Sequence, residues 1–163
     1  YLIFKPAMFI TAFFLIQYWR FNSDLMEKIS PYLNYKKFFL FFGIGSAIFL
    51  VLHSIFLGIK FDNDLYKLFR RIVLLCFIIF EIVAQTLLVI NIRKIREQIK
   101  KLVNIKILNL KIALVSILIL VAIVSIPFIT SMGYTRFKHA LEWNYFVGVI
   151  TFYMLTFFFW KKT

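Results

Sequence analysis

Glu81 is the residue whose type and position point most directly to chemistry. It lies near the middle of an apolar run that begins at Ile72, and Gln85 follows one helical turn later on the same face. If this apolar run crosses a membrane, an ionised carboxylate at its middle is costly. We therefore expect Glu81 to face other helices and to be protonated or paired. Two roles stay open for it: one station of a proton or ion path, or a hydrogen bond between helices.

The two histidines, His53 and His139, are the other candidates for chemistry. Both fall toward the same predicted side of the membrane, and two imidazoles that face each other across a helical bundle can be the axial ligands of a haem. We keep this haem as an alternative, and no cofactor or metal is otherwise predicted. The single cysteine, Cys76, supports neither a disulfide nor a thiolate metal site.

The sequence contains no nucleophile-elbow, zinc-protease or phosphate-loop motif. We therefore nominate no catalytic residue. An enzyme is unsupported by the sequence but stays open.

The segment 93–106 combines a basic face with an apolar one. Apolar residues recur at helical spacing from Ile92 to Val103, and the basic side chains fall largely on the other face. This pattern predicts an amphipathic extension of the membrane helix predicted over 72–92, lying in the inner interface. Its basic residues predict contact with anionic headgroups, or they serve only to set the topology. They are Arg93, Lys94, Arg96, Lys100 and Lys101.

Four small residues share one face of a helix predicted over 38–59: Gly43, Ala47, Ser54 and Gly58. Small side chains let another helix backbone come close. This stripe therefore predicts helix packing, either inside the monomer or against another membrane subunit.

Membrane helices must position these residues, because the chain is too apolar for a soluble domain of its length. Hydrophobic residues make up 63% of the 163 residues, more than a soluble domain of this size can bury. They occur in runs close to the ~20 residues that cross a bilayer core. We therefore predict an all-α polytopic transmembrane bundle, one domain over 1–163 with about five spans and short loops. The predicted spans are 1–19, 38–59, 72–92, 108–129 and 143–160.

The net charge of +13 comes from 20 Lys and Arg against 7 Asp and Glu. The basic residues mostly lie beside apolar runs, so we expect membrane phosphates rather than nucleic acid as their counter-charge. More of them fall on the side that carries residues 93–106, and the positive-inside rule then predicts an outside N-terminus and a C-terminus in the cytoplasm or an equivalent compartment. Which membrane holds the chain stays open. Trp19, Trp143 and Trp160 fall at predicted span ends, where interfacial indoles are common.

The segment 139–157 reads HALEWNYFVGVITFYMLTF, in which Glu142 and Trp143 open the last predicted helix and a Tyr-x-Leu-Thr-Phe pattern ends it. It resembles the final helix of the DRAM-like membrane proteins, the damage-regulated autophagy modulators with their Frag and Sfk relatives. The resemblance implies six helices with both termini cytoplasmic, and a helix before Tyr1 would complete that set. It also implies a protein that modulates autophagy, lipid or GPI-anchor handling, or signalling-lipid kinases, and it nominates Glu142 and Trp143 as motif positions.

Three functions therefore compete. The first is a non-enzymatic, DRAM-like membrane protein with a regulatory or structural, lipid-interacting role. The second is a small accessory subunit of a larger respiratory or transport complex, and the third is an ion or proton transport element that uses Glu81.

Overall fold

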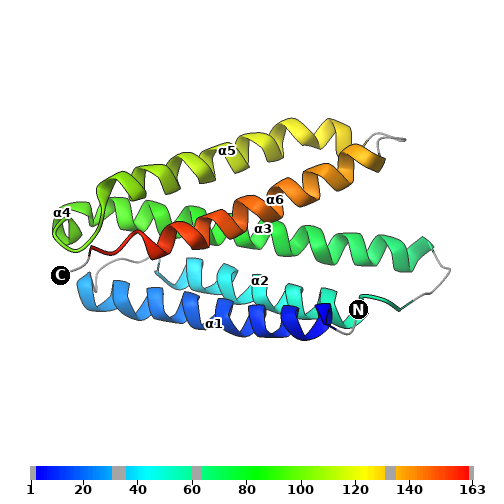
Figure 1. The fold of residues 1–163 in the computed structure, drawn as a ribbon, viewed down its shortest axis with the longest axis horizontal. Helices are drawn as coiled ribbons and strands as arrows, with labels where there is room; N and C mark the ends of the chain where they lie inside the picture. Colours follow the sequence, from blue (N-terminus) through cyan, green and yellow to red (C-terminus); the bar gives the residue numbers. More distant parts are fainter. Residues whose placement is uncertain (1–2, 31–35, 60–63, 131–134, 162–163) are drawn as a thin grey trace. The chain divides into compact units, whose positions relative to one another are not determined.

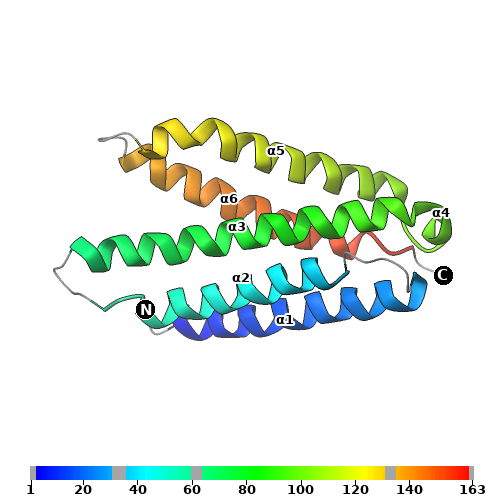
Figure 2. The ribbon, with the colours of Figure 1, turned by 180° about the vertical axis from the view of Figure 1, so that it is seen from behind.

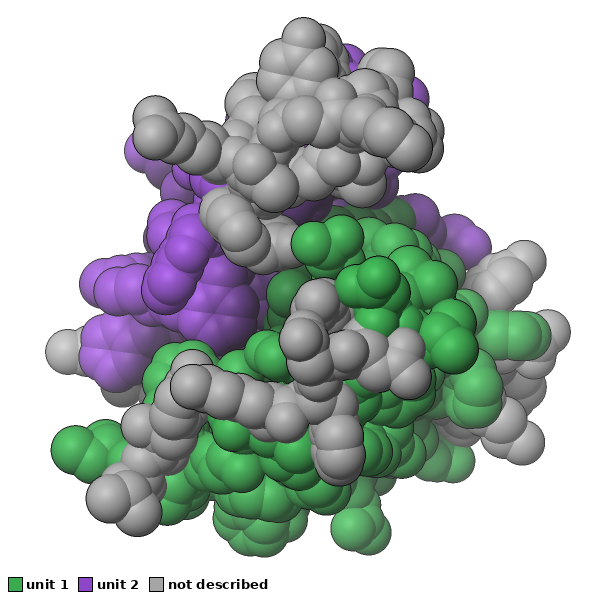
Figure 3. Space-filling model, turned by 90° about the vertical axis from the view of Figure 1, so that its right-hand side faces the viewer, with its two compact units in different colours: residues 1–88 green, residues 89–163 purple. Residues whose placement is uncertain are grey.

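The computed structural model describes residues 3–30, 36–59, 64–130 and 135–161, except for the side chains at 36–37, 67, 125–130, 135–139 and 142. Regular structure in these ranges is helical, apart from an isolated antiparallel bridge between Val103 and Trp160. The chain forms two compact units, Tyr1–Leu88 and Val89–Thr163, which Figure 3 colours separately.

The first unit is built on two antiparallel helices, α1 (Phe4–Ile29) and α2 (Lys36–Phe56). They run side by side in both views of the ribbon (Figures 1 and 2). At one end the Lys5 ammonium donates to the Ile55 carbonyl at 3.4 Å, and farther along the pair Trp19 packs on Gly43. Helix α3 (Asp64–Lys94) supplies the rest of this unit and continues into the second.

The small-residue stripe of α2 explains why α1 approaches so closely. Ala47 and Ser54 are fully buried, and a Cβ on Gly43 would overlap the Trp19 ring. The predicted stripe therefore packs inside the monomer up to Ser54. Gly58 is a correction, because α2 ends at Phe56 and Gly58 takes a left-handed φ of 85° in the exposed turn that follows.

The second unit contains the end of α3, the single turn α4 (Arg96–Ile99), α5 (Ile105–Thr130) and α6 (Thr135–Phe157). Helices α5 and α6 are antiparallel neighbours (Figure 1). The Tyr145 hydroxyl donates to the Leu118 carbonyl at 3.0 Å, and a Cβ on Gly148 would lie 2.5 Å from a Leu118 methyl carbon. Glycine at 148 therefore lets the two helices come close.

The predicted amphipathic extension over 93–106 is not one continuous helix. Helix α3 ends at Lys94, Ile95 leaves the helical conformation at φ −96° and ψ 12°, and α4 lasts one turn. The apolar side chains of the pattern, Ile95, Ile99 and Val103, are buried all the same. Burial of this face therefore bends the segment back on itself, and tertiary packing overrides the local helical preference.

Among the described residues, three helical segments are long and apolar enough to cross a membrane: Phe38–Phe56 with 19 residues, Asp64–Lys94 with 31, and Ile105–Val124 with 20. They indicate a membrane protein. Helix α6 adds a shorter apolar stretch, Trp143–Phe157. Helix α1 runs past the predicted end at Trp19 into a segment with four charged residues over 20–28, so it lacks the composition of the other three.

Trp19 does not lie in an interfacial belt. Its side chain is 0% exposed, and its ring centroid lies 6.2 Å from that of Phe39. Trp143 and Trp160, by contrast, are exposed.

Candidate functional site

The first candidate site is a buried polar cluster inside the first unit, formed by Ser46 of α2 with Glu81 and Gln85 of α3. All three side chains are 0% exposed. The Ser46 hydroxyl lies 2.6 Å from Glu81 Oε2, and the Gln85 amide donates to Glu81 Oε1 at 3.0 Å. The cluster therefore links two apolar helices through a carboxyl group.

The Ser46 hydroxyl has fewer hydrogens than the contacts it makes with acceptor oxygens. Ser46 Oγ also lies 2.8 Å from the carbonyl oxygen of Gly43, so one hydroxyl faces two acceptors. A serine hydroxyl carries a single hydrogen. Both short contacts become hydrogen bonds if the Glu81 carboxyl group brings a second hydrogen. Gln85 Oε1 forms no hydrogen bond with a described residue, so the cluster keeps an acceptor to spare.

The second candidate site is the basic hairpin, which we define as residues 93–104, from the last two residues of α3 to the start of α5. Its five predicted basic residues are exposed, whereas the side chains of Ile95, Ile99 and Val103 are buried. The C-terminal segment fastens it, because the Asn104 amide donates to the Phe159 carbonyl at 2.8 Å and the Lys161 amide to the Leu102 carbonyl at 3.0 Å. The hairpin thus presents cations from a fixed backbone.

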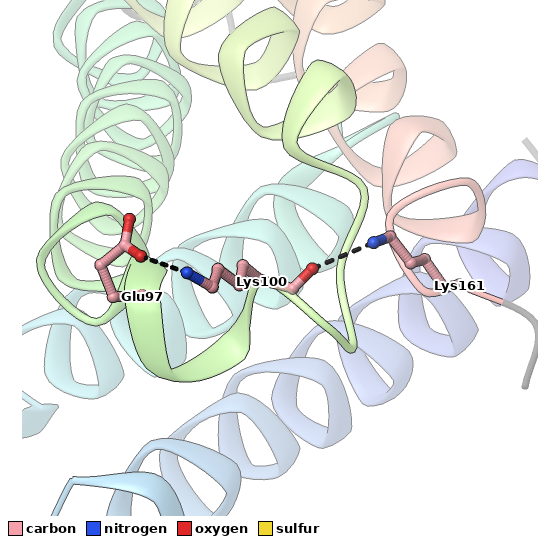
Figure 4. A network of polar contacts seen from close by, with 3 residues as sticks. All are labelled: Glu97, Lys100 and Lys161. Carbon is pink, nitrogen blue, oxygen red and sulfur yellow. Dashed lines mark hydrogen bonds and ion pairs between the residues drawn. The ribbon is translucent and has the colours of Figure 1, made fainter.

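One acidic residue interrupts the basic surface of the hairpin. Lys100 donates to Glu97 at 2.8 Å, and the Lys161 ammonium donates to the Lys100 carbonyl at 3.0 Å (Figure 4). The hydrogen bond and the charge of Lys100 lower the pKa of the Glu97 carboxyl group, with a smaller contribution from Arg96. Glu97 therefore stays ionised at neutral pH and offsets one of the hairpin cations.

Lys111 of α5 is a basic residue with a buried side chain, and it falls within the span predicted over 108–129. Its side chain is 2% exposed, and its ammonium donates to the Thr156 hydroxyl at 2.6 Å. The same ammonium lies 4.2 Å from the ring centroid of Phe152 and 5.3 Å from that of Phe159. A hydroxyl and two aromatic faces thus replace part of its hydration.

A signal for this burial is present in the sequence. Position 111 shares a helical face with Leu108, Val115 and Leu118, which are all core residues of α5. A lysine on a core face is expected to be buried with partners.

Comparison of the chain with protein-family models, curated proteins and solved structures finds no significant match. The family resemblance of residues 139–157 therefore stays a hypothesis.

The remaining predicted site residues belong to none of these clusters, or their side chains lie outside the described residues. Trp143 is exposed on α6, and the Glu142 side chain lies outside the described residues. His53 is half-buried on α2, and the side chain of His139 is likewise outside the described residues, so the haem stays a prediction. The described residues contain no group of three His, Cys, Asp or Glu side chains placed to hold a metal ion.

Replacing Lys111 with methionine is expected to leave the midpoint of thermal unfolding equal or higher, because a buried charge is removed while the unbranched side chain still fills its space.

Replacing Thr156 with valine is expected to cost about 1–3 kcal/mol of unfolding free energy, because the Lys111 ammonium loses its hydroxyl acceptor. Unfolding in detergent micelles measures both.

The matched control combines the two changes. In the Lys111→Met background, Thr156→Val should cost far less than it does alone, giving a clear coupling energy. Equal costs in both backgrounds would show that the Lys111–Thr156 hydrogen bond contributes nothing.

Proposed function

We propose that this chain is a non-enzymatic polytopic membrane protein that crosses the bilayer five times and holds its basic hairpin against anionic headgroups on the inner face. The observation that carries the proposal is the exposure of five basic side chains on a backbone tied to the C-terminal segment. Five cations less Glu97 leave four net charges. At about 1 kcal/mol per charge near an anionic surface, they contribute roughly 4 kcal/mol before screening.

The five-span topology extends the three long apolar helices by α1 and α6. Two arrangements support it: α1 packs along α2, and α6 packs along α5 with an apolar stretch of its own. With the hairpin inside, the N-terminus is outside and the C-terminus inside.

A cysteine-labelling experiment tests this orientation in a Cys76→Ser background. Asp64→Cys should react with an impermeant maleimide added outside intact cells, and Lys101→Cys should not. The reverse pattern would overturn the orientation.

Replacing all five hairpin cations with glutamine is expected to abolish the preference of the reconstituted protein for anionic lipid, because the electrostatic attraction is lost. Electron spin resonance of spin-labelled phosphatidylserine, compared with spin-labelled phosphatidylcholine, measures this preference. Glu97→Gln is the matched variant of opposite sign, since it removes the one anion and should raise the preference. If neither variant changes the preference, the lipid-contact proposal fails.

A second candidate function is a proton or cation station at Glu81. The contacts of Ser46 favour this function. A protonated Glu81 can donate to the Ser46 hydroxyl, which can then donate to the Gly43 carbonyl. The unused acceptor of Gln85 offers a further oxygen ligand. In liposomes with an imposed pH gradient, Glu81→Gln should stop proton flux if Glu81 is a station, and unchanged flux would end this candidate.

The two other proposed functions, a DRAM-like regulator and an accessory subunit, have less support. The DRAM-like regulatory role rests on the motif at 139–157, but Glu142 and Trp143, predicted to open the last helix, lie inside α6, which begins at Thr135. The accessory-subunit role loses its main argument, because the small-residue stripe of α2 already packs against Trp19 of α1.

A further inference from the structure

A pocket lies beside the basic hairpin, within the second unit. It has a volume of about 290 Å³ and is lined by Arg93, Arg96, Leu108, Asn109, Ile112 and Ala113. Two arginines and an asparagine thus line one concave site together with an apolar wall. This volume is at the lower end of the ~300–1,000 Å³ of small-molecule pockets, so it suits a headgroup rather than a whole lipid.

The two guanidinium groups are available to a ligand. Neither Arg93 nor Arg96 forms an ion pair with a described residue, and the neighbouring Glu97 carboxylate is held by Lys100 at 2.8 Å. Guanidinium groups bind phosphate oxygens in a bidentate manner, which makes arginine better suited than lysine to this recognition. The two positive charges of Arg93 and Arg96 therefore fit a phosphate group.

The apolar wall of the pocket continues along α5. Asn109, Ile112 and Ala113 share a helical face with Ile117 and Leu120, which follow at intervals of three to five residues. Ile117 is 58% exposed and Leu120 is 62% exposed. A molecule with a phosphate at the arginines would therefore meet a run of apolar side chains that leads away from them.

We propose that this pocket binds the phosphate of a single anionic phospholipid, with the acyl chain lying along the exposed face of α5. This inference rests on the lipid-contact function proposed above and assigns it a defined site. Arg93 and Arg96 hold the phosphate, and the wall from Ile112 to Leu120 supplies the contact that a free phosphate lacks. Lys94, Lys100 and Lys101 lie outside the pocket lining and contribute only general attraction.

Native mass spectrometry of the purified protein tests the proposal, with short-chain phosphatidic acid, short-chain phosphatidylcholine and inorganic phosphate as probes. We expect one phosphatidic acid to bind the unaltered protein. The Arg93→Gln/Arg96→Gln variant should bind it about tenfold or more weakly, because two charge-assisted contacts are lost. Ala113→Phe should weaken it similarly, because the added ring fills the pocket at an exposed position without changing the charge.

The matched control is Lys94→Gln/Lys101→Gln, which removes the same charge from the same hairpin, leaves the Lys100–Glu97 ion pair intact and should weaken binding much less. If this control loses as much affinity as the arginine variant, the pocket is overturned while general lipid contact stands. If inorganic phosphate binds as tightly as phosphatidic acid, the lipid assignment is overturned. The spin-label experiment above reports separately on general lipid contact, so the two failures are distinguishable.

Discussion

Replacing Gly43 with alanine is expected to lower the free energy of unfolding by about 1–3 kcal/mol, the range for forcing extra atoms into a packed core. The new Cβ would overlap the Trp19 ring, which is 0% exposed and packed beside Phe39. This prediction opposes intrinsic preference, because alanine is favoured over glycine in a helix by about 1 kcal/mol. Equilibrium unfolding in mixed micelles measures the change.

Gly45 is the matched control, because it lies two residues away in α2. A Cβ there would lie 2.5 Å from a Phe80 ring carbon, but Phe80 is only half-buried, whereas Trp19 is fully buried. Gly45→Ala should therefore cost clearly less than Gly43→Ala. Adding Trp19→Leu should recover part of the Gly43→Ala loss, because the smaller side chain makes room for the new methyl group. If Gly43→Ala is neutral or stabilising, α1 and α2 do not pack at Gly43 as described.

Replacing Glu81 with leucine is expected to cost about 1–3 kcal/mol of unfolding free energy, because the Gln85 amide loses its acceptor inside an apolar unit. Replacing Glu81 with glutamine should cost much less. The glutamine amide has nearly the shape of a protonated carboxyl group, and it supplies both an acceptor for Gln85 and a hydrogen for Ser46. Thermal unfolding of the two variants in the same detergent gives the comparison.

The contrast between these variants distinguishes a neutral cluster from an ionised one. Equal destabilisation by glutamine and leucine would show that the negative charge of Glu81 is required. The control is Thr86→Val one residue beyond Gln85, which removes only a hydroxyl bonded to its own helix at Ile82 and should change stability little.

The local residue pattern predicted the helices well and their ends less well. The apolar run from Ile72 to Ile92 does lie inside α3, but α3 begins eight residues earlier, at Asp64. Likewise, α1 continues to Ile29 through residues whose charge marks the end of an apolar run but not the end of a helix. Hydropathy reports where lipid can replace water, whereas helix ends depend on backbone hydrogen bonds.

The basic hairpin shows what periodicity could not reveal. Ile95, Ile99 and Val103 are buried at the predicted helical spacing, yet the helix ends at Lys94 and the hairpin backbone pairs farther on with Phe159 and Lys161. Those partners lie more than fifty residues away in the sequence. No local pattern contains them.

The sequence by itself determined that the chain is helical, strongly apolar and basic between its apolar runs, because composition and period act locally. It also predicted that Glu81 and Gln85 share a helical face. Only the tertiary structure decided their partner, because Ser46 comes from another helix. Its hydroxyl meets Glu81 only when the two helices pack together. Packing decided the rest in the same way: it buried Lys111 against Thr156, used the α2 stripe for Trp19, and brought Arg93 and Arg96 to one pocket.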